Sequence, residues 1–560
     1  MSKKVSQDMV LPVLIWEMFY IPIMRADNEL SHEEKVDRFN INFFNMADIC
    51  NKEYRQQYEL VCHTVLGSLC HDVPGLEWIS EILPKSHDHP HKATAGIKSS
   101  IHVEPTINLS EMDHHNMIVI LETLLRKRLY CLNEHLETNE EKENYTKALF
   151  TIQRVGATEE ELREAENIID RVVDRFGKMI LWGDQLTVKK ALEAISSRKE
   201  DWNKLERLEY IGILMLGDLH IMMAMVCKSF KSLMPTETSV NPGTLGSFAS
   251  ILMRSHRISN KESKIKKSGN FEEHSNFMLA CGSAILVEAL ERYNCELNVE
   301  GKTFPKTLAG AQHLLREFLT NSNIQLWWDP AVKEPIYYDD AEEYAVNTAT
   351  RTIILMAYKH ALKYGDATCI HAIHKILAIF FQFSSDVMNS QYGPSLMNEC
   401  IDYEGLSSMD KMRVDTMICI NYTGEEGKSI PVDCMNEHKV RECKCLMDRF
   451  TSSFDLNVVD RAMKANNEIV NLKDHLLECI CKENIKSGGG TSFTYFREEE
   501  KQLVKKEVRD ISPLLNPKGR KKVDYSFKSK GPWKNLTREK VQSIVDHKRE
   551  LYDLERGTNA

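Results

Sequence analysis

The strongest constraint in this sequence is a short apolar run that ends on a glycine and an acid. Met179-Ile180-Leu181-Trp182 is followed by Gly183-Asp184, and a helical pattern then runs from Thr187 to Ser197. A strand that leads directly into a helix is the building unit of α/β sheets, which place their chemistry at the carboxyl ends of the strands. We therefore expect Asp184 to stand at such an edge.

A second strand of the same kind is predicted farther along the chain. Tyr210–Gly217 is apolar and leads into Asp218-Leu219-His220, after which another helix begins. A strand–helix–strand–helix order predicts a parallel βαβ unit, in which Asp184, Asp218 and His220 share one edge. Two acids and a histidine there suit a metal site or acid–base chemistry. The alternative is that both aspartates cap the helices that follow them, because Asp is a favoured N-cap residue.

A third set of polar side chains lies far downstream. A turn around residues 423–427 is followed by a helical pattern that begins near Asp433 and includes Glu437. These two acids are four residues apart, so they project from one face of the helix or from its first turn. Acids also stabilise a helix N-terminus, which is the simpler explanation. The other explanation is that one of them joins Asp184 in a carboxylate cluster that binds Mg²⁺ or Mn²⁺ together with substrate phosphate.

Helical periodicity dominates the rest of the chain. Thr158–Phe176 has apolar residues at helical spacing, and it starts with the sequence pattern of a capping box. Asn347–Tyr364 and Ile370–Phe383 are helical by the same test. Extended segments are few, namely Val10–Met18, Lys178–Gly183, Tyr210–Gly217 and Met417–Tyr422. The sequence therefore predicts an α+β protein that is predominantly α-helical and is built around one small mixed sheet.

Polar stretches rich in glycine and proline divide the chain into five predicted segments. These are a partial N-terminal strand with helices at 1–85, a central βαβα core at 86–235, a helical insertion at 236–410, a return to the core at 411–485, and a basic flexible tail at 486–560.

Composition argues against several classes of protein. The net charge of −10 argues against a protein that coats nucleic acid with its whole surface. The 15 cysteines have no framework of spacings and no signal segment precedes them, so we expect reduced thiols in the nucleus or the cytoplasm. Charged residues interrupt both of the most apolar stretches, so no membrane span is expected. No Walker loop or dinucleotide fingerprint occurs, and no small-molecule cofactor is expected.

A basic cluster near the C-terminus is the candidate contact to nucleic acid. It consists of Lys518, Arg520, Lys521 and Lys522, and three aromatic residues, Tyr525, Phe527 and Trp533, follow it. Such a cluster suits nuclear import or nonspecific contacts with phosphates, and the aromatic rings would stack on exposed bases. The alternative is a solvated, disordered tail.

Taken in order, these motifs resemble an uncharacterised domain family that occurs in transposon-like proteins of animal and fungal genomes. The family is marked by a Gly-Asp-Gln-Leu-Thr motif, and the resemblance spans about residues 10 to 485. The matching residues are Gly183–Thr187, Asp218-Leu219-His220, Gly243-Thr244-Leu245 with Arg254, Glu399–Tyr403, and Asn421–Gly424 with Gly427, Asp433 and Glu437.

The resemblance to this family implies a function only because the family is in turn distantly similar to known enzymes. The family's arrangement is similar to that of cut-and-paste transposases with an RNase H-like core, such as the hAT group. On this comparison Asp184 corresponds to the second catalytic acid, and Asp218 with His220 to the pair of residues after it. Glu437 corresponds to the third acid, with Asp433 as its rival, and 236–410 to a helical insertion. The implied protein binds DNA in the nucleus and uses Mg²⁺ or Mn²⁺; the sequence leaves a homo-oligomer open.

One element of that core has no counterpart in this sequence. Longer members of the family carry an Asp-Asn-Trp-Asp-like segment, which would supply the first catalytic acid, whereas this sequence begins after it and Val10–Trp16 corresponds to a later strand. Two hypotheses follow. The first is a transposon-derived nuclease or strand transferase that acts through Asp184 and Glu437, with truncation or loss of activity left open. The second is a catalytically inert, domesticated descendant that binds DNA or protein.

Overall fold

The computed structural model describes most of the chain between residues 52 and 546. The described residues are 52–99, 113–235, 238–266, 270–329, 332, 335–382, 392–435, 437, 498–514, 521–528, 531–533, 536–543 and 546. The predicted strand Val10–Met18 lies outside them. Within these ranges helices predominate and the strands are short, which confirms the predicted predominantly helical α+β class.

The predicted βαβα unit is present and positions the candidate site. Strand β1 (Met179–Gly183) leads into helix α8 (Gln185–Ser197), and β2 (Ile211–Leu216) leads into α9 (Asp218–Leu233). The two strands pair in parallel, with Gly183 opposite Leu216. The carboxyl ends of both strands therefore lie next to each other, and the residues that follow them share one edge.

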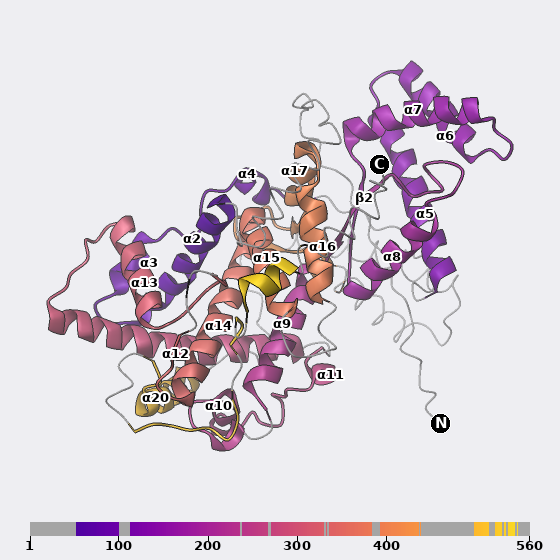
Figure 1. Cartoon of the computed structure of the whole chain (residues 1–560). Coiled ribbons are helices and arrows are strands. Elements are labelled where there is room, and N and C mark those ends of the chain that lie inside the picture. Colours follow the sequence, from indigo (N-terminus) through magenta and orange to yellow (C-terminus); the bar gives the residue numbers. More distant parts are fainter. Residues whose placement is uncertain are drawn as a thin grey trace, which may run out of the picture.

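Helices α5 (His114–Leu132), α6 (Asn139–Gln153) and α7 (Glu159–Phe176) gather with α8 at one end of the molecule (Figure 1). Their apolar faces form a core of their own, which also takes in side chains from β1 and from the chain that leads into β2. Helix α7 has the predicted capping box: Thr158 accepts a hydrogen bond from the Glu161 amide, and the Glu161 carboxylate accepts one from the Thr158 amide.

The cap of α7 gives a first testable prediction. Replacing Thr158 with alanine removes one of the two reciprocal bonds and leaves an amide of the first turn without its partner. We expect the free energy of unfolding to fall by about 1 kcal/mol, measured by urea denaturation. Thr151→Ala is the control, because Thr151 lies near the end of α6 and its hydroxyl donates a hydrogen bond to the Lys147 carbonyl of the same helix. An equal loss in both variants would contradict the role of the cap.

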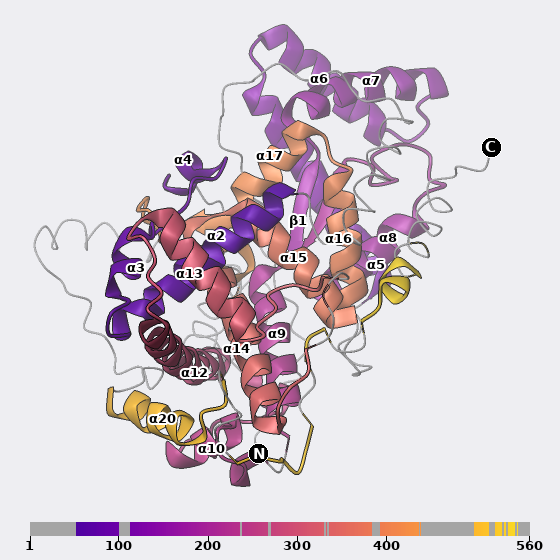
Figure 2. The same ribbon diagram turned by 60° about the vertical axis from the view of Figure 1, so that its left-hand side comes forward.

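A second, larger core unites most of the remaining helices. Long helices α12 (Asn270–Glu300), α14 (Asp340–Tyr364) and α15 (Ala367–Gln382) pack with α9, α16 (Tyr392–Glu404) and α2 (Lys52–Leu69) around it, as the two views show (Figure 2). The shorter elements are η1 (Cys70–Asp72), α3 (Glu77–Ile82), α4 (Lys92–Ala95), η2 (Asn133–His135), η3 (Thr238–Val240), α10 (Leu245–Ile251), α11 (Glu262–Ile265), α13 (Leu308–Asn321) and α17 (Ser408–Met417).

The expectation of one mixed sheet needs a correction. In the described residues β3 (Cys419–Asn421) pairs only with β4 (Ser429–Pro431), in an antiparallel hairpin, and the parallel pair β1–β2 is a separate sheet. The hairpin turn contains Gly424 and Gly427, both at positive φ, where a side chain would be strained. On its other side β3 bonds to Ser99, whose amide donates to the Asn421 carbonyl and whose hydroxyl accepts from the Asn421 amide.

The described part of the C-terminal region is packed against the larger core. Helix α20 (Glu498–Ile511) lies along α12, where Arg509 and Lys505 pair with Glu288 and Glu291. Tyr525 and Trp533 are buried, and Tyr525 and Phe527 stack on each other and meet Tyr344 edge-on. The rings of Tyr525 and Trp533 are thus covered in this structure, whereas Phe527 is half-buried, and the described pieces pack on the core. Stacking of these rings on exposed bases stays a prediction.

No helix in the described ranges is both long enough and apolar enough to cross a membrane. The polar residues Asp218 and His220 in the most apolar stretch, 210–227, belong to the first turn of α9.

Candidate active site at the carboxyl edge of the parallel strands

The edge where β1 and β2 end gathers acids from distant parts of the sequence. Asp184 follows β1, and Asp218 is the first residue of α9 after β2. Asp433 and Glu437 come from the helical turn directly after β4. Gly217, between β2 and α9, has to be small, because a Cβ there would overlap the side chain of Asp433.

Asp433 closes the N-terminus of α9 from more than 200 residues away in sequence. Its Oδ1 accepts a hydrogen bond from the Leu219 amide (3.0 Å), and its Oδ2 accepts one from the His220 amide (3.1 Å). The ring of His220 also lies 2.9 Å from Oδ2 through Nδ1. Helix N-termini carry unpaired amides and a partial positive charge, so a carboxylate there is strongly stabilised. Asp433 therefore does the capping that was considered for Asp218.

Asp218 does not cap its own helix, because its side chain points into the core. Its Oδ1 lies 2.6 Å from the Tyr358 hydroxyl and 2.9 Å from His374 Nε2. The other ring nitrogen of His374, Nδ1, lies 2.9 Å from Glu399 Oε1, and Glu399 Oε2 accepts a bond from the Leu216 amide at 2.6 Å. The capping alternative is thus wrong for Asp218: this carboxylate joins a buried network that ties β2 and α9 to α14, α15 and α16.

The buried network holds an imidazolium between two carboxylates. Burial alone would lower the pKa of His374, but the hydrogen bonds and charges of Asp218 and Glu399 raise it to about 10. His374 is fully buried, and both acids are nearly so. A charge so deep in the protein persists only when it is paired and hydrogen-bonded on both sides. The network therefore fixes the position of the strand edge and is out of reach of a substrate.

Asp184 caps helix α8 and also stands at the carboxyl end of β1. Its Oδ1 accepts a hydrogen bond from the Thr187 amide at 2.8 Å, so the capping alternative is correct for this residue. Asp184 is partly exposed, and the Gly217 amide bonds to the carbonyl of Gly183 just before it. In the part of the chain that the structure describes, Oδ2 of Asp184 has no hydrogen-bond or ion-pair partner. Asp184 thus acts as a helix cap while it stands at the carboxyl edge of β1.

His220 is the titratable group at the centre of this edge. Burial lowers the pKa of His220, but the bond to Asp433 outweighs this effect and raises it, and the charges of Asp184 and Glu437 act in the same direction. Glu437 Oε1 lies 3.8 Å from His220 Nε2, and the side chain of Glu437 is 52% exposed, whereas that of Asp433 is only 5% exposed. The protonated form of His220 is therefore favoured more than in an ordinary histidine, with Nδ1 bonded to Asp433 and Nε2 near the exposed Glu437.

The donor set at this edge suits a hard cation with few protein ligands. Among the described residues, no three histidine, cysteine, aspartate or glutamate side chains are placed to hold one metal ion. Asp433 uses both oxygens on α9, which leaves one oxygen of Asp184 and the carboxylate of Glu437. Mg²⁺ is commonly held by one or two carboxylates plus water and substrate phosphate. The assignment of Asp184 and Glu437 as metal ligands stays a prediction.

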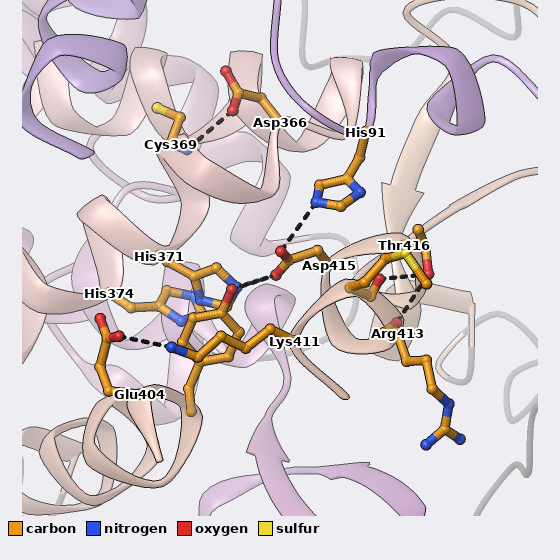
Figure 3. Close-up of polar contacts among 12 residues, drawn as sticks. His91, Asp366, Cys369, His371, His374, Glu404, Lys411, Arg413, Asp415 and Thr416 are labelled. Carbon is orange, nitrogen blue, oxygen red and sulfur yellow. Dashed lines mark hydrogen bonds and ion pairs between the residues drawn. The ribbon is translucent and has the colours of Figure 1, made fainter. Parts of the chain in front are cut away.

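A second polar network lies beside the first, around Asp415 of α17 (Figure 3). Its Oδ1 is 2.8 Å from His371 Nε2 and 2.7 Å from the Tyr403 hydroxyl, and its Oδ2 is 3.1 Å from His91 Nε2. Burial alone would raise the pKa of the Asp415 carboxyl. The hydrogen bonds from these donors, that of His371 above all, outweigh this effect and hold the pKa well below its usual range. The network fastens the segment around His91 to α15 and α17.

The predicted basic cluster is described only in part. Lys518 and Arg520 lie outside the described residues. Lys521 and Lys522 are exposed, and the Lys522 ammonium lies 5.0 Å from the centre of the Tyr338 ring, just before α14. A contact of these lysines with nucleic acid stays a prediction.

Sequence reasoning missed Tyr358, His374 and Asp415. Glu399 was noted only as part of a motif. The available signal was a set of polar residues inside strongly apolar helices: His371 and His374 interrupt the run of α15, and Tyr358 lies in the buried part of α14. Such residues need partners, because burying an unpaired polar group is costly. Which partners they have depends on how the helices pack.

A family model with the description "family of unknown function (DUF6589)" matches residues 38–484. The chain belongs to this family. The DUF6589 region contains every residue of the strand edge and both buried networks, and it ends before α20. No curated protein and no solved structure shows a significant match to the chain. The uncharacterised family predicted from the motifs is thereby confirmed at the level of a domain of unknown function.

Proposed function

We propose that this DUF6589 protein is a transposon-derived DNA-processing protein whose RNase H-like core cleaves or transfers phosphodiester bonds at the β1–β2 edge. The observation that carries the proposal is the meeting of Asp184, His220, Asp433 and Glu437 at the carboxyl ends of two parallel strands, where α/β sheets place their chemistry. A relationship to hAT transposases and a nuclear location are parts of this proposal.

The roles of the residues follow from their exposure and hydrogen bonds. Asp184 and Glu437 would hold Mg²⁺ or Mn²⁺, which when bound neutralises charge on a phosphate and activates water. Asp433 orients His220 through Nδ1 and favours its protonated form. Nε2 of His220 would donate its proton to the leaving 3′ oxygen as the P–O bond breaks, and Glu437 would accept a proton from the attacking water.

A cleavage assay tests this proposal. Supercoiled plasmid and labelled duplex DNA are incubated with the purified chain and Mg²⁺ or Mn²⁺. We expect cleavage that Asp184→Asn and Glu437→Gln each reduce by about 100-fold or more, as is usual when charge stabilisation in the transition state is lost. Asparagine remains a good N-cap, so α8 should stay intact. Asp113→Asn is the matched control, because Asp113 caps α5 in the same way and lies outside the edge.

The second candidate function is a catalytically inert module that binds DNA or protein. One observation favours it: Asp218 is buried with its Oδ1 bonded to Tyr358 and His374, and both oxygens of Asp433 bond to α9. Among the described acids of the edge, this leaves Asp184 and Glu437. DNA binding without cleavage in either metal, unchanged by Asp184→Asn, would support this candidate and reject the nuclease. Cleavage that persists in Asp184→Asn and Glu437→Gln would instead reject the assignment of the site.

A further inference from the structure

The segment between α10 and α12 carries a dense positive charge in a chain that is acidic as a whole. Residues 254–267 include six lysine or arginine residues and one glutamate, whereas the net charge of the whole chain is −10. The described cations are Arg254, Arg257, Lys261, Lys264 and Lys266, and Lys267 lies outside the described residues. A local concentration of positive charge attracts an anionic partner, because the fields of neighbouring cations add. We call residues 254–266 the basic segment.

The folded core holds the backbone of the basic segment in place. The side-chain amide of Asn260 donates a hydrogen bond to the Met234 carbonyl at the end of α9, at 2.9 Å. The Ser259 amide donates one to Nε2 of the buried His274 of α12, at 3.0 Å. Ile265 of α11 is buried in the larger core, and α11 lies against α9 and α12 (Figure 1). The basic segment is therefore a fixed part of the surface.

Two lysines of the basic segment are available to a partner. The other described cations have carboxylate partners, in the ion pairs Arg254–Glu500, Arg257–Glu273 and Lys266–Glu262. Lys261 and Lys264 are exposed, and neither has an ion-pair partner in the part of the chain that the structure describes. A long lysine side chain on a fixed backbone can reach a phosphate as a point charge. Lys261 and Lys264 are therefore the cations that a polyanion would contact first.

The basic segment lies along α9, the helix that begins at the strand edge. Burial raises the pKa of the Cys227 thiol to about 12, and the opposite charges of Lys266 and Glu262 both act on it, so α11 lies beside the middle of α9. Cys227 comes nine residues after Asp218, a rise of about 14 Å along the helix. Burial also raises the pKa of the Tyr392 phenol, and two acids of the strand edge and Glu262 raise it further. A duplex has a rise of about 3.4 Å per base pair, so about four base pairs span the distance from the segment to the edge.

We propose that the basic segment binds the phosphate backbone of DNA and holds a duplex at the strand edge. The inference rests on the proposed function for the choice of DNA as the partner, because the edge beside the segment is where the phosphodiester would react. Lys261 and Lys264 contact phosphates, and such contacts position a duplex without reading its sequence. They also release counterions, so the binding weakens steeply as the salt concentration rises.

Fluorescence anisotropy of a labelled duplex tests the proposal on the full chain. EDTA is present throughout, so that binding is measured without cleavage. We expect Lys261→Gln together with Lys264→Gln to weaken binding by about tenfold at moderate salt, and equally for duplexes of unrelated sequence. The slope of log affinity against log salt concentration should become shallower by about two, because two phosphate contacts are lost.

Two matched variants serve as controls. Lys306→Gln together with Lys363→Gln removes the same charge from exposed lysines of other elements, and it should leave the affinity and the slope nearly unchanged. Lys261→Arg together with Lys264→Arg keeps the charge of the basic segment and should keep the affinity. Unchanged affinity and slope in the glutamine variant of the basic segment, or an equal loss in the glutamine variant of the other lysines, would overturn the proposal.

An anionic membrane surface is the competing partner, and sedimentation with vesicles of phosphatidylcholine and phosphatidylserine measures it. Loss of vesicle binding in the glutamine variant of the basic segment, with its DNA binding unchanged, would make the segment a lipid contact and overturn the proposal. The cleavage assay separates this surface from the proposed function. Duplex binding that depends on Lys261 and Lys264, without cleavage in either metal, would support the surface and reject the nuclease. Cleavage with binding that does not depend on these lysines would reject the surface alone.

Discussion

Replacing His374 with alanine should lower the free energy of unfolding by about 3–5 kcal/mol, the largest effect expected of any single change discussed for this chain. His374 is fully buried and its two ring nitrogens each lie 2.9 Å from a carboxylate oxygen, of Asp218 and of Glu399. Removing the imidazolium leaves two buried acids facing each other with no cation between them. Desolvated like charges at such a distance are strongly unfavourable, so the loss exceeds that of an ordinary cavity.

Urea denaturation followed by circular dichroism measures this effect. His313→Ala is the control, because the His313 side chain is 58% exposed, forms an ion pair with Glu317 of its own helix and meets the ring of Phe304 edge-on. Surface changes of this kind usually alter stability by less than about 0.5 kcal/mol. If His374→Ala cost less than about 1 kcal/mol, the buried network could not be what fixes the strand edge. A loss that grows as the pH rises would agree with acids left unpaired in the variant.

Asp433→Asn should cost about 2 kcal/mol of stability and lower the pKa of His220. The carboxylate accepts two amide bonds at the start of α9 and one from the His220 ring, and hydrogen bonds to a charged group are worth about 1.5–3 kcal/mol each without being additive. Asparagine can accept through only one oxygen, and its NH₂ group would face an N–H donor. Glu437→Gln is the control on the same edge, because its side chain is 52% exposed and lies 3.8 Å from His220.

The contribution of the Asp433–His220 contact to stability depends on pH in a direction that can be predicted. The pKa of His220 is raised in the folded protein above its ordinary value near 6.5, mainly because Asp433 outweighs the effect of burial. Its contribution to stability is therefore complete below pH about 6.5 and is lost as the pH rises through the raised folded pKa. In Asp433→Asn this loss should disappear. Proton NMR of the His220 ring, titrated in both proteins, measures the shift; an unchanged pKa in the variant would contradict the assigned contact.

Local structure was largely predictable from the sequence. The strand ending at Gly183, the helix after it, the second strand before Asp218 and the capping box of α7 all occur where the pattern placed them. These features depend on neighbours in the chain: apolar alternation or helical spacing, and a side chain that can satisfy amides two or three residues away. The meeting of Asp184 with His220 also follows, because parallel pairing brings both carboxyl ends to one edge.

Which acid caps its helix and which is buried was not predictable from the local sequence. Asp184 and Asp218 stand in the same local context, after a strand and before a helix, yet one caps its helix and the other points into the core. The difference arises because Asp433 occupies the start of α9, while Tyr358 and His374 offer partners on the buried side. No local pattern around Asp218 reveals those three residues, since they lie between 140 and 215 residues away.

By itself the sequence determined the class of the fold, the βαβα unit and the set of polar residues available to it, because propensity, periodicity and capping act over a few residues. The tertiary structure alone decided which of those residues are buried as partners of one another and which remain exposed at the edge. That choice depends on how α14, α15 and the turn after β4 pack against α9, and packing joins residues that the sequence keeps far apart.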